Sequence, residues 1–321
     1  MINPYQSLDF ENSLQIPSLS HCHCREQGKF ESLYSMGTRH FAISNYYPSE
    51  PFYPLSDVLS NVPEDAIGCP NAEHHNMLVN GTMIPALHIN SLGSTFSSNP
   101  DSQSTGVNQD WMLTLNQIFA DLQYSDGGGV TINHPKWTDW FTQINMKRMI
   151  PTMLDYDDRV LGIEIYNHSC EVSEDQPNTG YALDYWDQIL KSGRRCWGLA
   201  VPDHHSYGRN VLLVSEATEY ECLKAYRQGH FYCRVYNTDL AFSGISLDGY
   251  KLSVDTNHAT SITIVTSGGK ATYNGSSCEH NVNPSAVYVR VEAKDDTDEI
   301  YSNPIIFKEY SKRKHNLMMW Y

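Results

Sequence analysis

Two histidines two positions apart end an apolar stretch near the start of the chain, which reads Leu19-Ser20-His21-Cys22-His23-Cys24. In a β-strand, side chains at positions i and i+2 share a face, so His21 and His23 can reach one metal ion while both cysteines point the other way. This geometry excludes a site made from all four consecutive His and Cys side chains. A single His-x-His pair is a weak pattern, and chance placement explains it about as well.

Further ligand-type side chains stand at the ends of other predicted strands or close to them. These residues are Glu73, His88, His134, Asp203 and His205. Asp203 and His205 again alternate, so they share a face, and Pro135 ends the strand that precedes it. In a barrel of parallel strands, catalytic groups come from the carboxyl ends of several strands. The recurrence therefore favours a functional site over coincidence.

The mixture of imidazoles and carboxylates suits zinc, manganese or iron better than calcium or magnesium. A carboxylate such as Glu73 can bridge two ions, and a pair of ions roughly 3.5–4 Å apart activates water and stabilises a charged transition state. The chemistry indicated is ester hydrolysis, with a phosphoester as the best candidate. Gly127-Gly128-Gly129 lacks the Lys-Ser/Thr of a phosphate-binding loop.

Short apolar runs alternate with helical patterns as far as about residue 230, which predicts a parallel sheet with crossover helices. Helices are expected from Trp111 to Leu122, from Ala182 to Leu190, and from Thr218 to Gly229, where Glu221 completes a capping box. The predicted strands are Leu19–His23, Phe41–Ser44, Ala86–Asn90, Val130–Asn133, Leu161–Ile165 and Trp197–Val201.

After about Thr238 the pattern changes to short strands separated by turn dipeptides such as Asp248-Gly249 and Gly268-Gly269. We therefore expect a metal-dependent hydrolase domain over residues 1–237 and a small all-β, sandwich-like domain over residues 238–321. The second domain could bind carbohydrate, pack a dimer or cover the first domain, and the sequence leaves these roles open.

The order His-x-His, Glu, His, His-Pro, Glu, Asp-x-His resembles the PHP (polymerase and histidinol phosphatase) family of metal-dependent phosphoesterases, and the resemblance spans roughly Pro17 to Tyr232. It implies an α/β fold, a distorted (β/α)7 TIM-like barrel, with two or three divalent ions. The implied ligands of one ion are His21, His23, Glu73 and Asp203, and those of a second are Glu73, His88 and His134. Asp203 is also implied as a base toward the metal-bound water.

The chain also departs from the family pattern. Members usually place a further Asp or His shortly after the His-x-His pair, where this chain has Gly28 and Lys29. Of the ligands expected for a third ion, only His205 is clearly present. Either two ions suffice, or the enzyme is impaired, or another histidine fills the place, the candidates being His74, His75 and His204.

Several residues are candidates for contact with a substrate. Arg25 and Arg209 follow the ligand motifs and could hold a phosphate through two hydrogen bonds, although ordinary ion pairing explains them equally well. Glu164 and Asn167 lie at the end of a predicted strand, and both are expected to contact the substrate or to support the ligands. His40 begins its strand, at the end away from the site, and is interpreted as structural.

The formal net charge of -15 over 321 residues argues against binding to nucleic-acid polymers or anionic membranes. Bound cations could still attract a small phosphorylated substrate. No apolar stretch reaches the roughly 20 residues of a membrane span, so we expect a cytoplasmic protein. The eight cysteines are interpreted as reduced thiols. The oligomeric state is left open.

The leading hypothesis is a phosphoesterase in which hydroxide held between two ions attacks the phosphorus of a small phosphomonoester or nucleotide. In this hypothesis Glu73 and Asp203 are the catalytic carboxylates. One alternative keeps the metals but acts on carbonyl substrates, as an amidohydrolase does. A second alternative is a catalytically silent protein that binds metal or another ligand.

Overall fold

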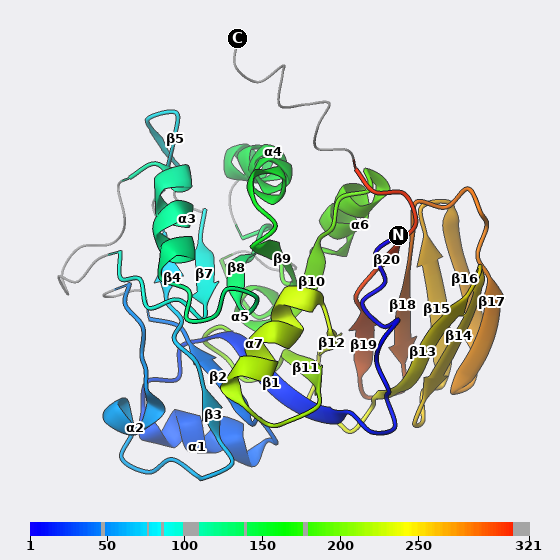
Figure 1. Ribbon diagram of the computed structural model, residues 1–321, viewed down its shortest axis with the longest axis horizontal. Helices are drawn as coiled ribbons and strands as arrows, with labels where there is room; N and C mark the ends of the chain where they lie inside the picture. Colours follow the sequence, from blue (N-terminus) through cyan, green and yellow to red (C-terminus); the bar gives the residue numbers. More distant parts are fainter. Residues whose placement is uncertain are drawn as a thin grey trace.

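The chain folds into a mixed α/β structure whose strands form several sheets (Figure 1). The computed structural model describes residues 1–45, 49–75, 77–84, 87–98, 109–137, 140–175 and 179–310, without the side chains of 140–145. The helices are α1 (Gln27–Ser35), α2 (Leu55–Val58), α3 (Trp111–Ala120), α4 (Trp140–Tyr156), α5 (His168–Glu171), α6 (Leu183–Lys191) and α7 (Glu219–Gln228).

The strands are β1 (Leu14–Cys22), β2 (His40–Ile43), β3 (Ile67–Gly68), β4 (Glu73–His74), β5 (Met77–Val79), β6 (Thr82–Ile84), β7 (Ile89–Leu92), β8 (Gly129–Ile132), β9 (Val160–Asn167), β10 (Trp197–Val201), β11 (Arg209–Val214), β12 (Phe231–Arg234), β13 (Phe242–Asp248), β14 (Lys251–Thr256), β15 (Ser261–Thr266), β16 (Gly269–Asn274), β17 (Ser277–Asn281), β18 (Tyr288–Lys294), β19 (Glu299–Ser302) and β20 (Ile305–Ile306).

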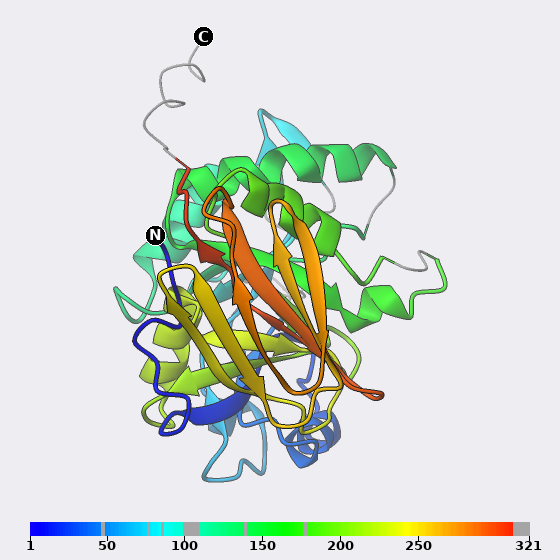
Figure 2. The ribbon, with the colours of Figure 1, turned by 90° about the vertical axis from the view of Figure 1, so that its right-hand side faces the viewer.

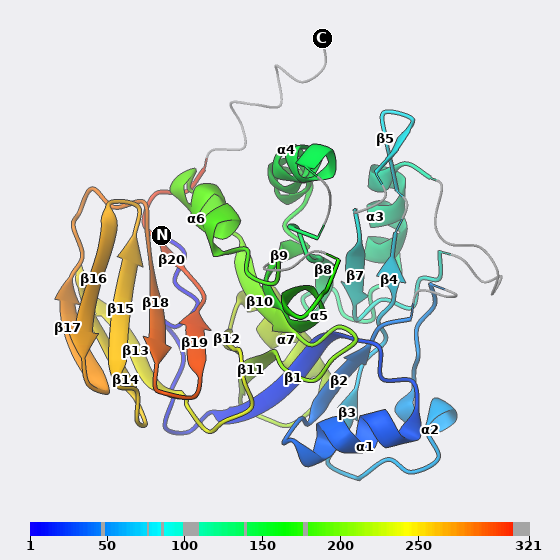
Figure 3. The ribbon, with the colours of Figure 1, turned by 180° about the vertical axis from the view of Figure 1, so that it is seen from behind.

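The longest sheet joins the first strands to the last ones in the order β16-β15-β18-β19-β12-β11-β1-β2-β3. Its β1-β2-β3 part is parallel, whereas β11 and β12 run antiparallel to their neighbours. A second sheet has the order β10-β9-β8-β7-β4 (Figure 3). In it, β8, β9 and β10 are parallel, but β7 is antiparallel to both β8 and β4.

The described strands do not close into a barrel, so the predicted (β/α)7 barrel is not confirmed. The antiparallel strands β7 and β11 interrupt the parallel order, and no ladder runs from β10 to β1. Among the described residues, an isolated bridge between Cys22 and Asp203 joins the two sheets instead. The carboxyl ends of two short parallel groups, β1-β2-β3 and β8-β9-β10, therefore lie near each other.

The helices were predicted well where their ends carry clear signals. Helix α7 begins after Thr218, whose side chain accepts a hydrogen bond from the Glu221 N–H at 3.3 Å, and it ends at Gly229 in the left-handed conformation. Helices α3 and α6 also match their predicted positions. Together with α4 they share an apolar core with the second sheet, while α1 and α2 pack against β1 and β2.

The C-terminal strands form two sheets (Figure 2), and the side chains between them make one apolar core. Strands β13, β14 and β17 make one sheet, and β15, β16, β18 and β19 belong to the longest sheet. Because β19 pairs with β12, this sheet continues across the predicted boundary at residue 237, which stays a prediction. None of the described helices is both long and apolar enough to cross a bilayer.

Candidate metal centre

Six of the predicted ligands lie together where the two sheets meet, namely His21, His23, Glu73, His88, His134 and Asp203. Backbone hydrogen bonds fix this junction: the His23 N–H donates to Asp203 O at 3.0 Å, and the Asp203 N–H donates to His21 O at 3.2 Å. On the other side, the Glu73 N–H donates to Asn45 O at 3.1 Å. The end of β1 is thus tied to the residues that follow β10.

The first ligand group consists of His21, His23 and Glu73. The two Nε2 atoms lie 3.3 Å apart, and Glu73 Oε2 lies 3.3 Å from that of His21 and 3.1 Å from that of His23. Asp203 Oδ1 is 3.5 Å and 3.3 Å from the same two nitrogens. Four potential ligand atoms therefore point at one another.

The second ligand group consists of Glu73, His88 and His134. Glu73 Oε1 lies 2.9 Å from His88 Nδ1 and 3.4 Å from His134 Nε2. His88 precedes its strand, but β7 runs antiparallel to β8, and the Asn133 N–H donates to His88 O at 3.0 Å. Glu73 thus places one oxygen in each group.

A third ligand group consists of His23, Asp203 and His204. His204 Nε2 lies 3.6 Å from Asp203 Oδ1, and its ring stacks on that of His23 with the centroids 4.1 Å apart. Its side chain is 52% exposed. Of the three histidines that could replace a missing ligand, His204 is the one that the structure brings to such a group.

Hydrogen bonds at the far side of the rings fix which nitrogens can bind a cation. His23 Nδ1 lies 3.0 Å from Ser44 O, which can only accept, so Nδ1 carries the proton and Nε2 offers its lone pair. His21 Nδ1 lies 2.7 Å from Glu164 Oε1 in the same manner. Asn167 Nδ2 donates to Glu164 Oε2 at 2.9 Å and to Asp203 Oδ2 at 3.1 Å.

The charges of the cluster are compatible with a cation among its ligand atoms. Burial disfavours charge, yet Asp203 and Glu73 raise the pKa of His21, and the same carboxylates raise that of His23 to about 9. The pKa of Glu73 is held below its usual range by His21 and the neighbouring histidines, although burial opposes this shift. A divalent ion would satisfy the same carboxylates without protonating the imidazoles.

The backbone of two of these residues also fits a constrained site. His134 and Asp203 adopt left-handed backbone conformations, with φ of 24° and 54°, which non-glycine residues seldom adopt outside constrained sites. The described residues therefore fit divalent ions through nitrogen and oxygen ligands.

The remaining predicted residues lie differently. His205 is exposed, and its ring contacts that of His168 at 5.2 Å, outside the three groups. Arg209 is fully buried and donates to Thr38 Oγ1 at 2.9 Å, so its guanidinium is used within the fold. Arg25 is exposed and donates to Asn45 Oδ1 at 2.6 Å.

The other histidines near Glu73 also have defined places. His74 hydrogen-bonds Ser98 and Ser91 through its two nitrogens, at 2.6 Å and 2.9 Å, so neither nitrogen is left to bind a metal. The ring of His75 lies 5.2 Å from that of His88, and His75 belongs to none of the three groups. His40 begins β2 and bonds Ser18 Oγ at 2.7 Å, as its structural interpretation predicted.

No family model matches the chain, and no curated protein matches it. Its fold is similar to a crystal structure from Bacteroides vulgatus, described as a two-domain protein containing a predicted PHP-like metal-dependent phosphoesterase. The two chains share 12% identity with a TM-score of 0.46, over 95% of this chain and 99% of the other.

Two site features were missed in the sequence. Trp137 packs against His134 and His88, with ring centroids 5.0 Å and 5.7 Å away, and only its position three residues after His134 hinted at this. Ser44 contributes a backbone carbonyl, which no sequence pattern could reveal. Both contacts depend on how loops turn after a strand ends.

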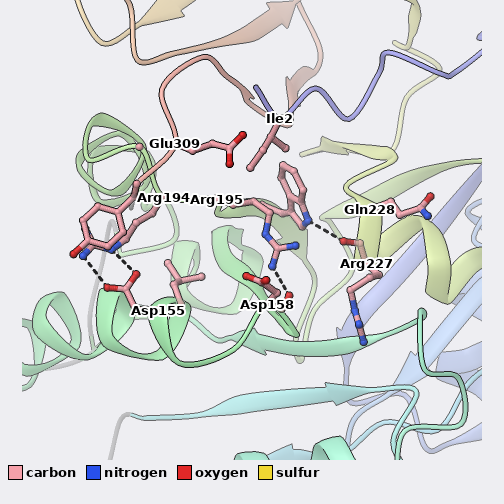
Figure 4. A pocket seen from close by; sticks show the side chains of 12 residues that line it. Ile2, Asp155, Asp158, Arg194, Arg195, Arg227, Gln228 and Glu309 are labelled. Atoms are coloured by element: carbon pink, nitrogen blue, oxygen red, sulfur yellow. Dashed lines mark hydrogen bonds and ion pairs between the residues drawn. The ribbon is translucent and has the colours of Figure 1, made fainter. Parts of the chain in front are cut away.

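A separate cavity of about 640 Å³ lies beside the amino ends of β9 and β10 (Figure 4). Arg194, Arg195 and Arg227 line it together with Asp155 and Asp158. Arg194 is paired with Asp155 at 2.8 Å, and Arg227 donates to backbone carbonyls. This cavity shares no residue with the ligand groups, so we place the candidate site at the sheet junction.

Proposed function

We propose that this protein is a metal-dependent phosphoesterase that hydrolyses a small phosphomonoester or nucleotide. One observation carries the proposal: Glu73 directs one oxygen to His21 and His23, and its other oxygen to His88 and His134. A carboxylate shared in this way suits two neighbouring divalent ions, which when bound supply an activated water and a positive field for the phosphoryl group.

The mixed nitrogen and oxygen ligands favour zinc, manganese or iron. His21, His23, Glu73 and Asp203 would hold one ion, and Glu73, His88 and His134 the second. His204 supports a third ion beside Asp203, since its nitrogen lies 3.6 Å from that carboxylate. The ions would also offset the net charge of -15 near an anionic substrate.

The chain's own side chains position the ligands. Glu164 accepts three hydrogen bonds, from His21 Nδ1, the His134 N–H and Asn167 Nδ2. A single carboxylate thus orients one ligand at the end of β1 and another just after β8. Burial alone would raise the pKa of Asp203, but His21 and His23 hold it well below its usual range. Asp203 is therefore ionised, which is the form in which a carboxylate can bind a cation or accept a proton. Arg25, exposed beside Asn45, is the proposed contact for the phosphate.

The test is metal content and turnover on the same full-length protein. Chelator-treated protein is reloaded with zinc, manganese or iron(II), the bound metal is counted by elemental mass spectrometry, and a panel of phosphomonoesters and amides is assayed. We expect two or more ions per chain and hydrolysis of phosphomonoesters only. Hydrolysis of amides alone would instead support an amidohydrolase, and an absence of bound metal would overturn both readings.

A further inference from the structure

An exposed indole stands next to the second ligand group. Trp137 is 38% exposed, whereas the described side chains of Trp111, Trp186 and Trp197 are at most 6% exposed. An indole offers a large apolar surface, and burying such a surface is normally favourable. Its exposure beside Glu73, His88 and His134 therefore leaves an aromatic surface available to a ligand at this place.

The position of Trp137 is set by the chain around it. Its N–H donates to His134 O at 2.9 Å, which fixes the turn after β8. Its ring meets that of His134 edge to face, at 5.0 Å and 72°. The neighbouring Lys136 pairs with Asp184 at 2.6 Å, so this cation is directed toward α6. The side chain that this turn places beside the ligands is therefore the ring of Trp137, whereas Lys136 points away from them.

A second exposed ring flanks the cluster at its other ligand groups, since His204 stacks on His23. A phosphate that reaches Glu73 therefore has an exposed ring beside the second ligand group and another beside the third. The part of the substrate attached to the phosphate would meet these rings. Flat π-systems stack on such surfaces, and stacking of a base on an aromatic side chain tolerates many base identities.

From this arrangement we infer that Trp137 selects phosphomonoesters whose alcohol part carries a planar aromatic or heteroaromatic ring. The inference rests on the proposed phosphoesterase function and narrows its substrate class. Trp137 acts here as a specificity-determining residue that contacts the leaving group. It takes no part in ligation or proton transfer.

The experiment compares two pairs of substrates: benzyl phosphate against cyclohexylmethyl phosphate, which differ in the planarity of the ring, and a nucleoside 5′-monophosphate against ribose 5-phosphate, which lacks the planar base. In the metal-loaded wild type, kcat/KM should favour the planar member of each pair. Trp137→Ala should raise KM for the planar members by about 5- to 150-fold and change kcat little, because stacking contributes mainly to binding. Trp137→Phe should retain most of the preference.

Tyr250→Ala provides a matched control, since Tyr250 is 44% exposed and lies in the turn after β13, in the C-terminal strands. It should leave both substrate ratios unchanged. A Trp137→Ala enzyme that keeps the wild-type ratios would overturn the inference.

Binding separates this inference from the proposed function. Benzylphosphonate has no ester bond to hydrolyse, so its affinity can be measured by calorimetry even if the protein cleaves none of the substrates. Weaker binding to Trp137→Ala than to wild type would then support the contact while the phosphoesterase proposal fails. Equal binding to both would overturn the contact.

Discussion

At the scale of single residues, Glu164 connects two ligands of the candidate centre that come from different strands. It receives hydrogen bonds from His21 Nδ1 at 2.7 Å and from the His134 N–H at 2.7 Å, and it is buried. Such outer partners of metal ligands fix the ring orientation and the tautomer. Glu164 therefore governs the geometry of ligands from two strands.

We predict that Glu164→Gln lowers metal affinity or activity by about 10- to 100-fold, because the amide replaces one carboxylate oxygen with a donor. Metal titration followed by calorimetry measures the change. Glu171→Gln is the control, because Glu171 lies in α5 outside the three ligand groups. Unchanged affinity in Glu164→Gln would contradict the role assigned to Glu164.

His40 provides a pH prediction outside the metal centre. Burial lowers its pKa from 6.5 in the unfolded chain to about 3. Between these values the unfolded chain binds a proton that the folded chain does not, so stability is full above about pH 6.5 and falls as the pH drops toward 3.

The expected slope from His40 is about 1.4 kcal/mol per pH unit within this range. His40→Asn keeps a polar partner for Ser18 and removes the titration, so its unfolding free energy, measured by urea denaturation, should depend less on pH by that amount. A variant with the wild-type slope would show that His40 titrates normally in the fold.

Strand spacing predicted the side-chain directions of one pair of ligand candidates and misled for another. His21 and His23 share a face because strand side chains alternate, and the structure places both nitrogens together. The same alternation predicted a partner for Asp203 in His205, but Asp203 has φ of 54° and the chain turns there. His204 thus lies on His23 instead, which strand periodicity could not indicate.

At the scale of elements, two glycines with similar backbones differ in their surroundings. Gly229 ends α7 with φ of 75°, and a Cβ there would lie 2.7 Å from the ring of Trp197. Gly249, with φ of 59°, has no atom within 4 Å of such a Cβ. The pair separates the cost of the backbone conformation from the cost of a clash.

Gly249→Ala should lower the unfolding free energy by about 1–2 kcal/mol, the cost of a left-handed alanine. Gly229→Ala should cost clearly more, because the buried Trp197 has to move. Chemical denaturation of both variants gives the comparison. Equal losses would mean that the core around Trp197 adapts freely.

Capping residues made the ends of the helices predictable, but no sequence signal of this kind indicates the direction of a strand within a sheet. Thr218 and Gly229 mark the two ends of α7 in the sequence. A short stretch such as Ile89–Leu92 can indicate a strand without its orientation, and β7 runs antiparallel to β8. This orientation brings His88 to the centre and also breaks the parallel order that a barrel requires.

At the scale of the whole molecule, the C-terminal strands are joined to α6 by ion pairs around the buried Arg290. Arg290 in β18 is 1% exposed and pairs with Asp187 at 2.9 Å and with Glu292 at 2.8 Å. Its guanidinium also lies 4.8 Å from the centre of the Trp186 ring. Tyr288 donates to the same Asp187 at 2.9 Å.

Arg290→Met should destabilise the protein by about 3 kcal/mol, because Asp187 would keep its charge at this interface without its strongest partner. Thermal and urea unfolding measure the loss. Lys251→Met removes a pair between exposed side chains, at 2.7 Å from Glu279, and should cost less than about 1 kcal/mol. Similar losses in the two variants would mean that the ion pairs of Arg290 contribute little to stability.

The continuous sheet across residue 237 shows why local sequence patterns could not define the division into domains. Composition changes near Thr238, but β12 and β19 pair over a long sequence separation. Strand pairing of this kind depends on the whole chain, and a local pattern carries no record of it. The two-domain division therefore stays a prediction.

The candidate centre also lies at the junction of the two sheets, where the Cys22–Asp203 bridge joins the end of β1 to the residues after β10. Ions bound there would cross-link the two sheets. Loading the chelated protein with manganese at about 100 times its dissociation constant should raise the unfolding free energy by about 2.7 kcal/mol, while hydrogen exchange slows at the ends of β1 and β10. Exchange that slows elsewhere, or not at all, would contradict this.

The ligand residues at this junction would thus serve both metal binding and the joining of the two sheets. A substitution that weakens ion binding would also weaken the contact between the sheets. The fraction of the protein that folds during synthesis would then depend on the supply of metal.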